Sequence, residues 1–207
     1  ERFGENTLKI IEDNPEKLTL VPGIGPAKAR AVSEAFQAHK EFAGIVLYFQ
    51  QFGISAGYAT KLYKVYGSDT IAAVEENPYQ LVNDIFGIGF RKADQIAEKM
   101  GVDKHSEHRI KSGMRFGLWA FVSDGQTFAP KKLFCEKISE LLDIGAEEIN
   151  EYLVEMAFEG ELQIERIEGR EAVFLMPYYM AEQSVCRKLL ELSHSMLKPV
   201  SAKLDSL

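Results

Sequence analysis

Two short segments of the chain combine glycines with a cation at the same spacing. Each holds Gly-Ile-Gly, then a lysine three residues after the second glycine and an alanine after it: residues 23–25 with Lys28, and residues 87–89 with Lys92. Glycine permits φ values that a side chain would forbid, so each triplet predicts a tight turn around a buried isoleucine that leads directly into a helix. The open amides of a helix N-terminus bind phosphate oxygens, and a lysine one turn later adds positive charge. The spacing therefore predicts two phosphate sites.

The repeat extends beyond the triplets. Asn-Pro at residues 14–15 precedes the first and Asn-Pro at residues 77–78 the second, where asparagine is expected as a helix N-cap and proline as the first helical residue. A degenerate copy lies between them, with Ser55 in place of the second glycine and Tyr58 at the lysine position. The lead glycines recur at 23, 53 and 87, a period typical of stacked units. This pattern predicts a helix-hairpin-helix array whose middle copy is mainly structural.

We expect this array to contact the DNA phosphate backbone without reading base sequence. The expected contacts are the backbone and cations of the two intact hairpins: Gly23, Ile24, Gly25, Lys28, Arg30, Gly87, Ile88, Gly89, Arg91 and Lys92. Gly53 and Ser55 of the degenerate copy are expected to contribute less. A left-handed φ at Gly25 and Gly89 would make valine at either position damage folding as well as binding.

The charge of the chain limits this hypothesis. The formal net charge is -7; residues 1–105 carry 12 Lys+Arg against 14 Asp+Glu, and residues 106–207 carry 12 against 17. Neither half is basic, so phosphate contact has to be local to the hairpins. Binding by this chain alone is therefore expected to be weak and strongly salt-dependent.

Other residue types indicate little further chemistry. No apolar run approaches the roughly 20 residues of a membrane span, so no membrane partner is expected. Cys135 and Cys186 match no metal or redox spacing, which favours a reducing, cytoplasmic location. The histidines give no convincing metal set, and we assign no metal: His39, His105, His108 and His194.

The spacing of apolar residues, together with the glycines and prolines that interrupt helices, predicts a mainly α protein with three segments. These are a helix-hairpin-helix domain (1–104), a winged-helix-like α+β domain (105–178), and a connecting helix and tail (179–207). In the first, short helices are expected over 26–38, 41–52, 58–66, 69–76, 78–84 and 90–100. In the second, we expect a helix over 109–122, a strand over 126–128, helices over 130–142 and 146–159, and a β-hairpin over 162–167 and 172–175. An amphipathic helix is expected over 179–197.

The third helix of a winged-helix domain often reads DNA. Here it holds five acidic residues and no Lys or Arg: Glu147, Glu148, Glu151, Glu155 and Glu159. Phosphate would be repelled, so we interpret this domain as a packing or protein-docking module. Arg166 and Arg170 of the β-hairpin are the minor alternative for DNA contact.

Several motifs between residues 3 and 142 occur together: Phe3-Gly4 with Thr7-Leu8, Asn14-Pro15-Glu16-Lys17-Leu18, Gly23-Ile24-Gly25, Gly53-Ile54-Ser55, Tyr66-Gly67, Asn77-Pro78-Tyr79-Gln80-Leu81, Gly87-Ile88-Gly89-Phe90, Ala93-Asp94-Gln95-Ile96-Ala97, Arg109-Ile110 and Gly125-Gln126-Thr127. This set resembles the N-terminal region of the RecD-like (RecD/TraA) ATP-dependent DNA helicases. One departure is Gln126, where that family usually has histidine.

The resemblance implies a non-catalytic accessory region of a 5′-to-3′ DNA helicase, similar to the alpha subunit of exodeoxyribonuclease V and acting in DNA repair and recombination. The implied partners are single-stranded or junction DNA and the motor domain of the same polypeptide. No Gly-x-x-x-x-Gly-Lys-Ser/Thr loop occurs in the sequence, so we expect ATP and Mg²⁺ to bind a motor outside this chain, which itself carries no catalytic motif.

Two alternatives remain at this stage. A helix-hairpin-helix DNA glycosylase would use a hairpin lysine and a downstream aspartate, which Lys92 and Asp103 with Arg109 superficially match. However, the nucleophile is expected two residues after the second glycine, where Arg91 stands, and no cysteine cluster for an iron–sulfur centre is present. The other alternative is a pure protein-interaction module that docks the helicase motor or a partner.

Overall fold

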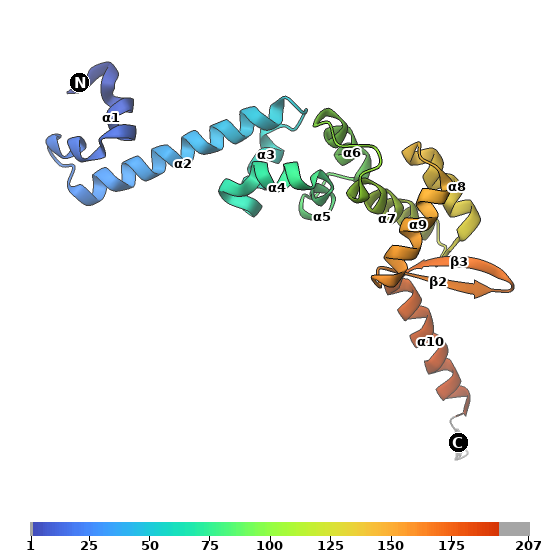
Figure 1. Ribbon diagram of the computed structural model, residues 1–207. Coiled ribbons are helices and arrows are strands. Elements are labelled where there is room, and N and C mark those ends of the chain that lie inside the picture. The colour runs from blue at the N-terminus through green and yellow to red at the C-terminus, as the bar shows by residue number, and fades with distance from the viewer. Residues whose placement is uncertain (1, 195–207) are drawn as a thin grey trace, which may run out of the picture. The chain divides into compact units, whose positions relative to one another are not determined.

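The computed structural model describes residues 2–194 (Figure 1). The protein is mainly helical with one small antiparallel sheet, as the sequence predicts. It divides into two compact units, one ending at Asp103 and the other beginning at Lys104. Within the described residues, no helix is both long enough and apolar enough to cross a bilayer.

The first unit alternates α-helices with 3-10 turns. Its elements are η1 (Gly4–Asn6), α1 (Thr7–Asp13), η2 (Pro15–Leu20), α2 (Pro26–Gln50), α3 (Ala56–Tyr66), η3 (Gly67–Asp69), α4 (Thr70–Glu76), η4 (Pro78–Gln80), α5 (Leu81–Asp84) and α6 (Phe90–Lys99). The prediction of two helices over 26–38 and 41–52 is wrong, because nothing between Ala38 and Glu41 breaks a helix and Gly44 is accommodated inside it.

Apolar side chains anchor the inter-helix turns of this unit in its core. Ile54 and Ile88, the central residues of two Gly-led turns, are buried with Phe49, Leu62 and Phe90. Fully burying an isoleucine contributes roughly 1.5–3 kcal/mol, which fixes the position of each turn. Ile24 in the first turn is half-buried.

The two Asn-Pro segments differ in their capping. The Asn77 side chain accepts a hydrogen bond from the backbone amide of Tyr79 at 3.0 Å. Asn14 makes no such side-chain bond, so its predicted capping role is wrong. Both residues precede short 3-10 turns rather than α-helices.

The second unit has the predicted order of helix, short strand, two helices and a β-hairpin. Its elements are α7 (Glu107–Ser123), β1 (Ala129–Pro130), α8 (Lys131–Leu142), α9 (Ala146–Phe158), β2 (Leu162–Ile167), β3 (Arg170–Leu175) and α10 (Met176–His194). The sheet order is β1-β3-β2, all antiparallel, with Val173 opposite both Ala129 and Ile164. Glu168 and Gly169 both have positive φ, which suits a two-residue hairpin turn.

Two predicted boundaries shift in the second unit. The strand expected over 126–128 lies at Ala129–Pro130, because the amide of Gln126 still bonds to the Phe121 carbonyl and Gly125 turns the chain with a φ of 84°. The last helix begins at Met176 rather than 179. Its predicted end at 197 and the tail to 207 lie outside the described residues.

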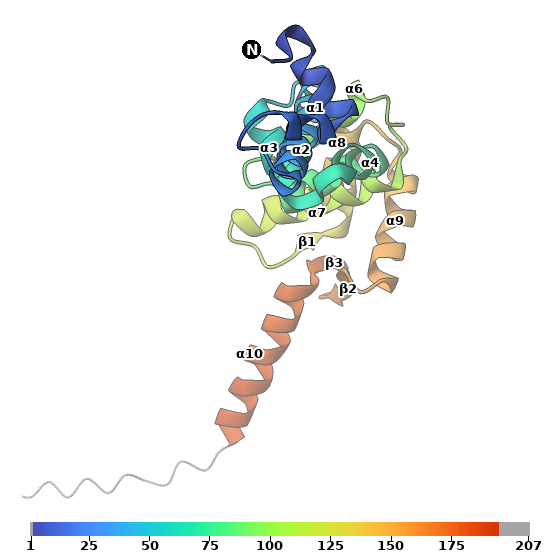
Figure 2. The ribbon, with the colours of Figure 1, turned by 90° about the vertical axis from the view of Figure 1, so that its left-hand side faces the viewer.

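Glycines on α7 allow α8 to pack closely. A Cβ built on Gly113 would lie 2.7 Å from Leu142 Cδ2, and one on Gly117 would overlap Ile138. The first turn of α10 packs through the rings of Tyr178 on Trp119 and of Tyr179 on Phe174. From there α10 leads away from the β2–β3 hairpin (Figure 2), and its side chains from Met180 onward are exposed.

Candidate nucleic-acid interface

The three repeats share one backbone turn. The first glycine of each has a left-handed φ: 85° at Gly23, 83° at Gly53 and 97° at Gly87. Two residues later the chain is extended; Gly25 has φ -84° and Gly89 φ -93°. The expectation of left-handed geometry at Gly25 and Gly89 is therefore wrong. The first glycine makes the left-handed step, and the second only leads the extended chain into the helix.

The helices that follow begin without a side-chain cap. The N-cap residues Gly25, Ser55 and Gly89 provide no side-chain hydrogen bond to the first turns of α2, α3 and α6. A Cβ built on Gly25 or Gly89 would meet no atom within 4 Å, so the space before both helices is open. Because the first turn of a helix lacks intrahelical acceptors for its amides, these N-termini can receive an anion.

The second and third hairpins hold each other. From α3, the Tyr58 hydroxyl donates to the Gly87 carbonyl at 3.2 Å and Lys61 Nζ donates to the Phe86 carbonyl at 3.2 Å. In return, Lys99 Nζ of α6 donates to the Phe52 carbonyl at 3.5 Å. The degenerate copy therefore supports the turn of the third hairpin.

Cations gather at this paired site. Lys92 Nζ lies 4.1 Å from the centre of the Tyr58 ring, and Lys61 Nζ lies 5.3 Å from the same centre. A cation over an aromatic face is attracted to it, so the tyrosine holds both ammonium groups at the turn. Across residues 2–194, neither lysine forms an ion pair, and neither does the exposed Arg91.

The first hairpin forms a separate site. Lys28 is exposed on the first turn of α2, whereas Arg30 lines a cavity of about 430 Å³ against η2. Helix α2 has 25 residues, so the first hairpin lies about 38 Å from the second, at the other end of the helix (Figure 1). The predicted contact residues therefore fall into two groups: Gly23, Ile24, Gly25, Lys28 and Arg30 in one, and Gly53, Ser55, Gly87, Ile88, Gly89, Arg91 and Lys92 in the other.

Sequence reasoning missed several residues of the paired site. The repeat pattern identifies Tyr58 only as a replacement for lysine, and it does not indicate a role for Lys61, Lys99 or Phe86. Lys61 follows Tyr58 by three residues, a spacing that places both on one helical face and gives the one available sequence signal.

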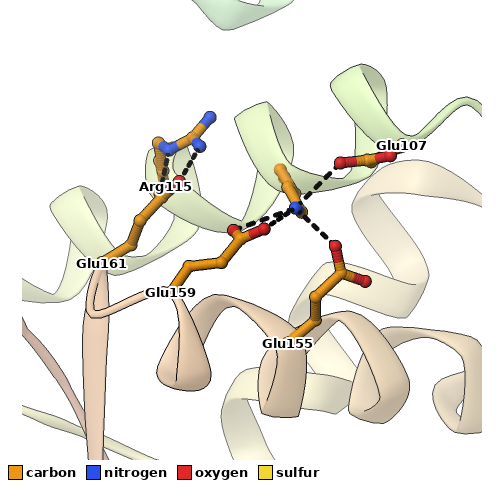
Figure 3. A network of polar contacts seen from close by, with 6 residues as sticks. Glu107, Arg115, Glu155, Glu159 and Glu161 are labelled. Atoms are coloured by element: carbon orange, nitrogen blue, oxygen red, sulfur yellow. Dashed lines mark hydrogen bonds and ion pairs between the residues drawn. The ribbon is translucent and has the colours of Figure 1, made fainter.

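The second unit contains a buried cation on α7 (Figure 3). Lys111, whose side chain is 8% exposed, donates to Glu155 at 2.7 Å, Glu107 at 2.8 Å and Glu159 at 3.0 Å. Burial alone lowers the pKa of Lys111, but the hydrogen bonds to the three carboxylates outweigh it and raise this pKa above its usual value. The hydrogen bond from Lys111 likewise lowers the pKa of Glu107.

Helix α9 contains no Lys or Arg, as the sequence shows, but three of its glutamates have partners from outside the helix. Glu155 and Glu159 pair with Lys111, and Glu148 contacts His105 Nδ1 at 2.9 Å. Folding brings α7 beside α9, so Glu155 and Glu159 meet a lysine that is distant in sequence. Of the five glutamates, only Glu147 and Glu151 form neither a side-chain hydrogen bond nor an ion pair across residues 2–194.

The residues matched to a glycosylase have other contacts. Lys92 Nζ lies against the Tyr58 ring, and Arg109 donates to the carbonyls of Lys104 at 3.0 Å and Leu142 at 2.8 Å. Arg109 thereby ties α7 to the end of α8. No group of three metal-ligating side chains occurs in the part of the chain that the structure describes.

Glycine-led turns, uncapped helix N-termini and two mutually packed hairpins define a helix-hairpin-helix protein. Residues 38–128 match the model of a family described as the ATP-dependent RecD2 DNA helicase HHH domain. The chain is also 24% identical over 130 residues to the ATP-dependent RecD2 DNA helicase of Deinococcus radiodurans, which covers 62% of this chain and 18% of that relative. The protein therefore contains a RecD2-type helix-hairpin-helix region, which includes the second and third hairpins; the first precedes the matched residues.

Proposed function

We propose that the hairpin unit is a DNA-binding accessory region of a RecD-like helicase and holds the phosphate backbone without reading base sequence. The observation that carries this proposal is the pair of open helix N-termini after Gly25 and Gly89, each followed by a lysine one turn later. Open amides and a nearby ammonium group match the oxygens and charge of a phosphate.

Local charge supports the proposal despite the acidic chain. Residues 53–64 contain two lysines and residues 85–92 one arginine and one lysine, with no Asp or Glu in either segment. The two hairpin sites lie about 38 Å apart along α2, close to one turn of duplex DNA at about 34 Å. A ligand that reaches both sites therefore has to extend over roughly one helical turn.

The activity of the whole protein is a further part of the proposal. From the similarity to RecD2 helicases, we propose that a motor in the same polypeptide uses ATP and Mg²⁺ and that the protein acts in cytoplasmic DNA repair or recombination. The hairpin unit would hold single-stranded or junction DNA beside that motor.

Charge reversal tests the binding proposal. In fluorescence anisotropy titrations with unrelated oligonucleotides, Lys28→Glu with Lys92→Glu should weaken binding equally for all sequences and reduce the salt slope by about two. The matched control is Lys132→Glu with Arg187→Glu, the same charge change on exposed residues of the second unit. Strong sequence preference, no binding at low salt, or an equal loss in the control would refute the proposal.

We further propose that the second unit, whose element order is that of a winged helix, docks a protein surface rather than DNA. Exposed apolar side chains on α10 favour this role: Val185, Leu189, Leu190 and Leu192. Because Glu147 and Glu151 lie outside the Lys111 cluster, Glu147→Lys with Glu151→Lys should keep the fold and raise DNA affinity. A fall in DNA affinity would place the acidic face in the DNA site and contradict the docking role.

A further inference from the structure

The tip of the third hairpin carries an aromatic ring in water. Phe86 is 95% exposed. The equivalent Phe52 in the second hairpin is half-buried and packs edge-on against Tyr48, with ring centres 5.2 Å apart. The first hairpin has Pro22 at this place. Of the three hairpin tips, only the third therefore presents an uncovered aromatic face.

The backbone holds Phe86 in this position. Its carbonyl accepts a hydrogen bond from Lys61, and the carbonyl of the next residue, Gly87, accepts one from Tyr58. Ile85 and Ile88 on either side are buried, and the Ile88 amide donates to the Ile85 carbonyl at 3.0 Å. The ring therefore projects from a turn that three hydrogen bonds and two buried isoleucines hold in place, which reduces the entropy lost when a ligand binds it.

Two lysines lie close to the backbone of the turn that carries Phe86. Lys61 Nζ bonds to the carbonyl of Phe86 itself, and Lys92 Nζ lies on the Tyr58 ring whose hydroxyl contacts the neighbouring residue. The combination of an exposed aromatic side chain and adjacent ammonium groups matches a nucleotide, which has a flat base and a charged phosphate. Exposure of an aromatic ring is not sufficient for this role. Phe158 is 94% exposed, but it lies on α9 between Glu155 and Glu159, whose carboxylates would repel a phosphate.

We propose that Phe86 stacks on a nucleobase of an unpaired DNA strand whose phosphates lie against Lys61 and Lys92. This inference rests on the proposed DNA-binding function and adds the residue that contacts a base and the reason for a preference for unpaired DNA. In a duplex both faces of a base are covered by its neighbours, so access to a base face requires unstacking. An unpaired strand offers the face without that cost, so the hairpin pair is expected to prefer single-stranded DNA or the unpaired arm of a junction.

The test compares three probes: single-stranded oligo(dT), a strand of the same length with abasic sites, and a duplex. Phe86→Ala should weaken oligo(dT) binding about tenfold and leave binding of the abasic strand and the duplex unchanged. Phe86→Tyr should retain oligo(dT) affinity, and Phe158→Ala, the matched control, should change nothing. Circular dichroism should give unchanged melting for Phe86→Ala, since the ring is exposed.

The outcomes separate the inference from the proposed function. Lys61→Glu with Lys92→Glu should weaken all three probes, because it removes phosphate contacts. If that variant weakens binding and Phe86→Ala does not, the stacking inference is overturned while phosphate binding stands. An equal loss on duplex and oligo(dT) in Phe86→Ala would overturn the assignment to an unpaired strand. Failure of the unaltered protein to bind any probe would overturn the proposed function itself.

Discussion

Alanine at the two glycines of the third hairpin should have opposite effects on stability. Gly87 has a φ of 97°, and left-handed geometry costs an L-residue about 1–2 kcal/mol. Its new Cβ would also lie 3.2 Å from the Tyr58 hydroxyl, which donates to the Gly87 carbonyl; losing that hydrogen bond costs about 1 kcal/mol. Gly87→Ala should therefore lower the free energy of unfolding by roughly 2–3 kcal/mol.

Gly89 has neither a left-handed φ nor a close neighbour. Its φ is -93° and a Cβ there meets no atom within 4 Å. Gly89→Ala should therefore be neutral or should stabilise the fold by about 0.4–1 kcal/mol, because alanine gives the unfolded chain less conformational entropy than glycine. The added methyl group nevertheless stands before the open N-terminus of α6, so phosphate affinity should fall without a loss of stability. The same separation is expected for Gly23 and Gly25.

Urea unfolding followed by far-ultraviolet circular dichroism measures the difference between the two variants. The single tryptophan, Trp119, lies in the second unit, so its fluorescence transition serves as an internal reference that should stay unchanged. Equal destabilisation by Gly87→Ala and Gly89→Ala, or a neutral Gly87→Ala, would show that the left-handed step is not confined to the first glycine.

Three further predictions concern the second unit, and Trp119 fluorescence can follow each. Lys111→Met leaves three partly exposed carboxylates facing one another and should cost about 1–2 kcal/mol, less than a fully buried pair; unchanged stability would contradict a structural role for the cluster. Because the pKa of Glu107 is lowered in the fold, its contribution is present above its ordinary pKa of 4.5 and should be lost as the pH falls through the folded value, an effect absent in Glu107→Gln. Gly113→Ala should cost about 1–3 kcal/mol through overlap with Leu142, and combining it with Leu142→Ala should cost less than the sum of the two changes.

Local chemistry explains which features of the fold could be predicted. The two Gly-Ile-Gly turns and the Glu168-Gly169 hairpin turn each depend on a few adjacent residues, and Gly23, Gly87 and Gly169 all have positive φ in the structure. The prediction of a break inside α2 is wrong for the complementary reason: no residue near 38–41 interrupts a helix, so a single helix runs from Pro26 to Gln50.

Contacts between distant residues explain what could not be predicted. The pairing of Tyr58 with Gly87 and of Lys111 with Glu155 and Glu159 depends on elements that meet only after folding. The sequence places glutamates on α9 but does not indicate that a lysine 44 residues earlier neutralises one of them. For the candidate site, the glycines and hairpin cations could be predicted, whereas the tyrosine that holds Lys92 and the exposed ring of Phe86 could not.

The salt dependence of DNA affinity tests the central claim most directly. We expect the unaltered protein to bind several unrelated single-stranded sequences with equal affinity, and log affinity to fall linearly with log salt concentration. Four hairpin cations, Lys28, Lys61, Arg91 and Lys92, would give a slope of roughly -3 if each neutralises one phosphate. Affinities that differ more than about tenfold between sequences, or that do not change with salt, would contradict phosphate-backbone binding by the hairpins.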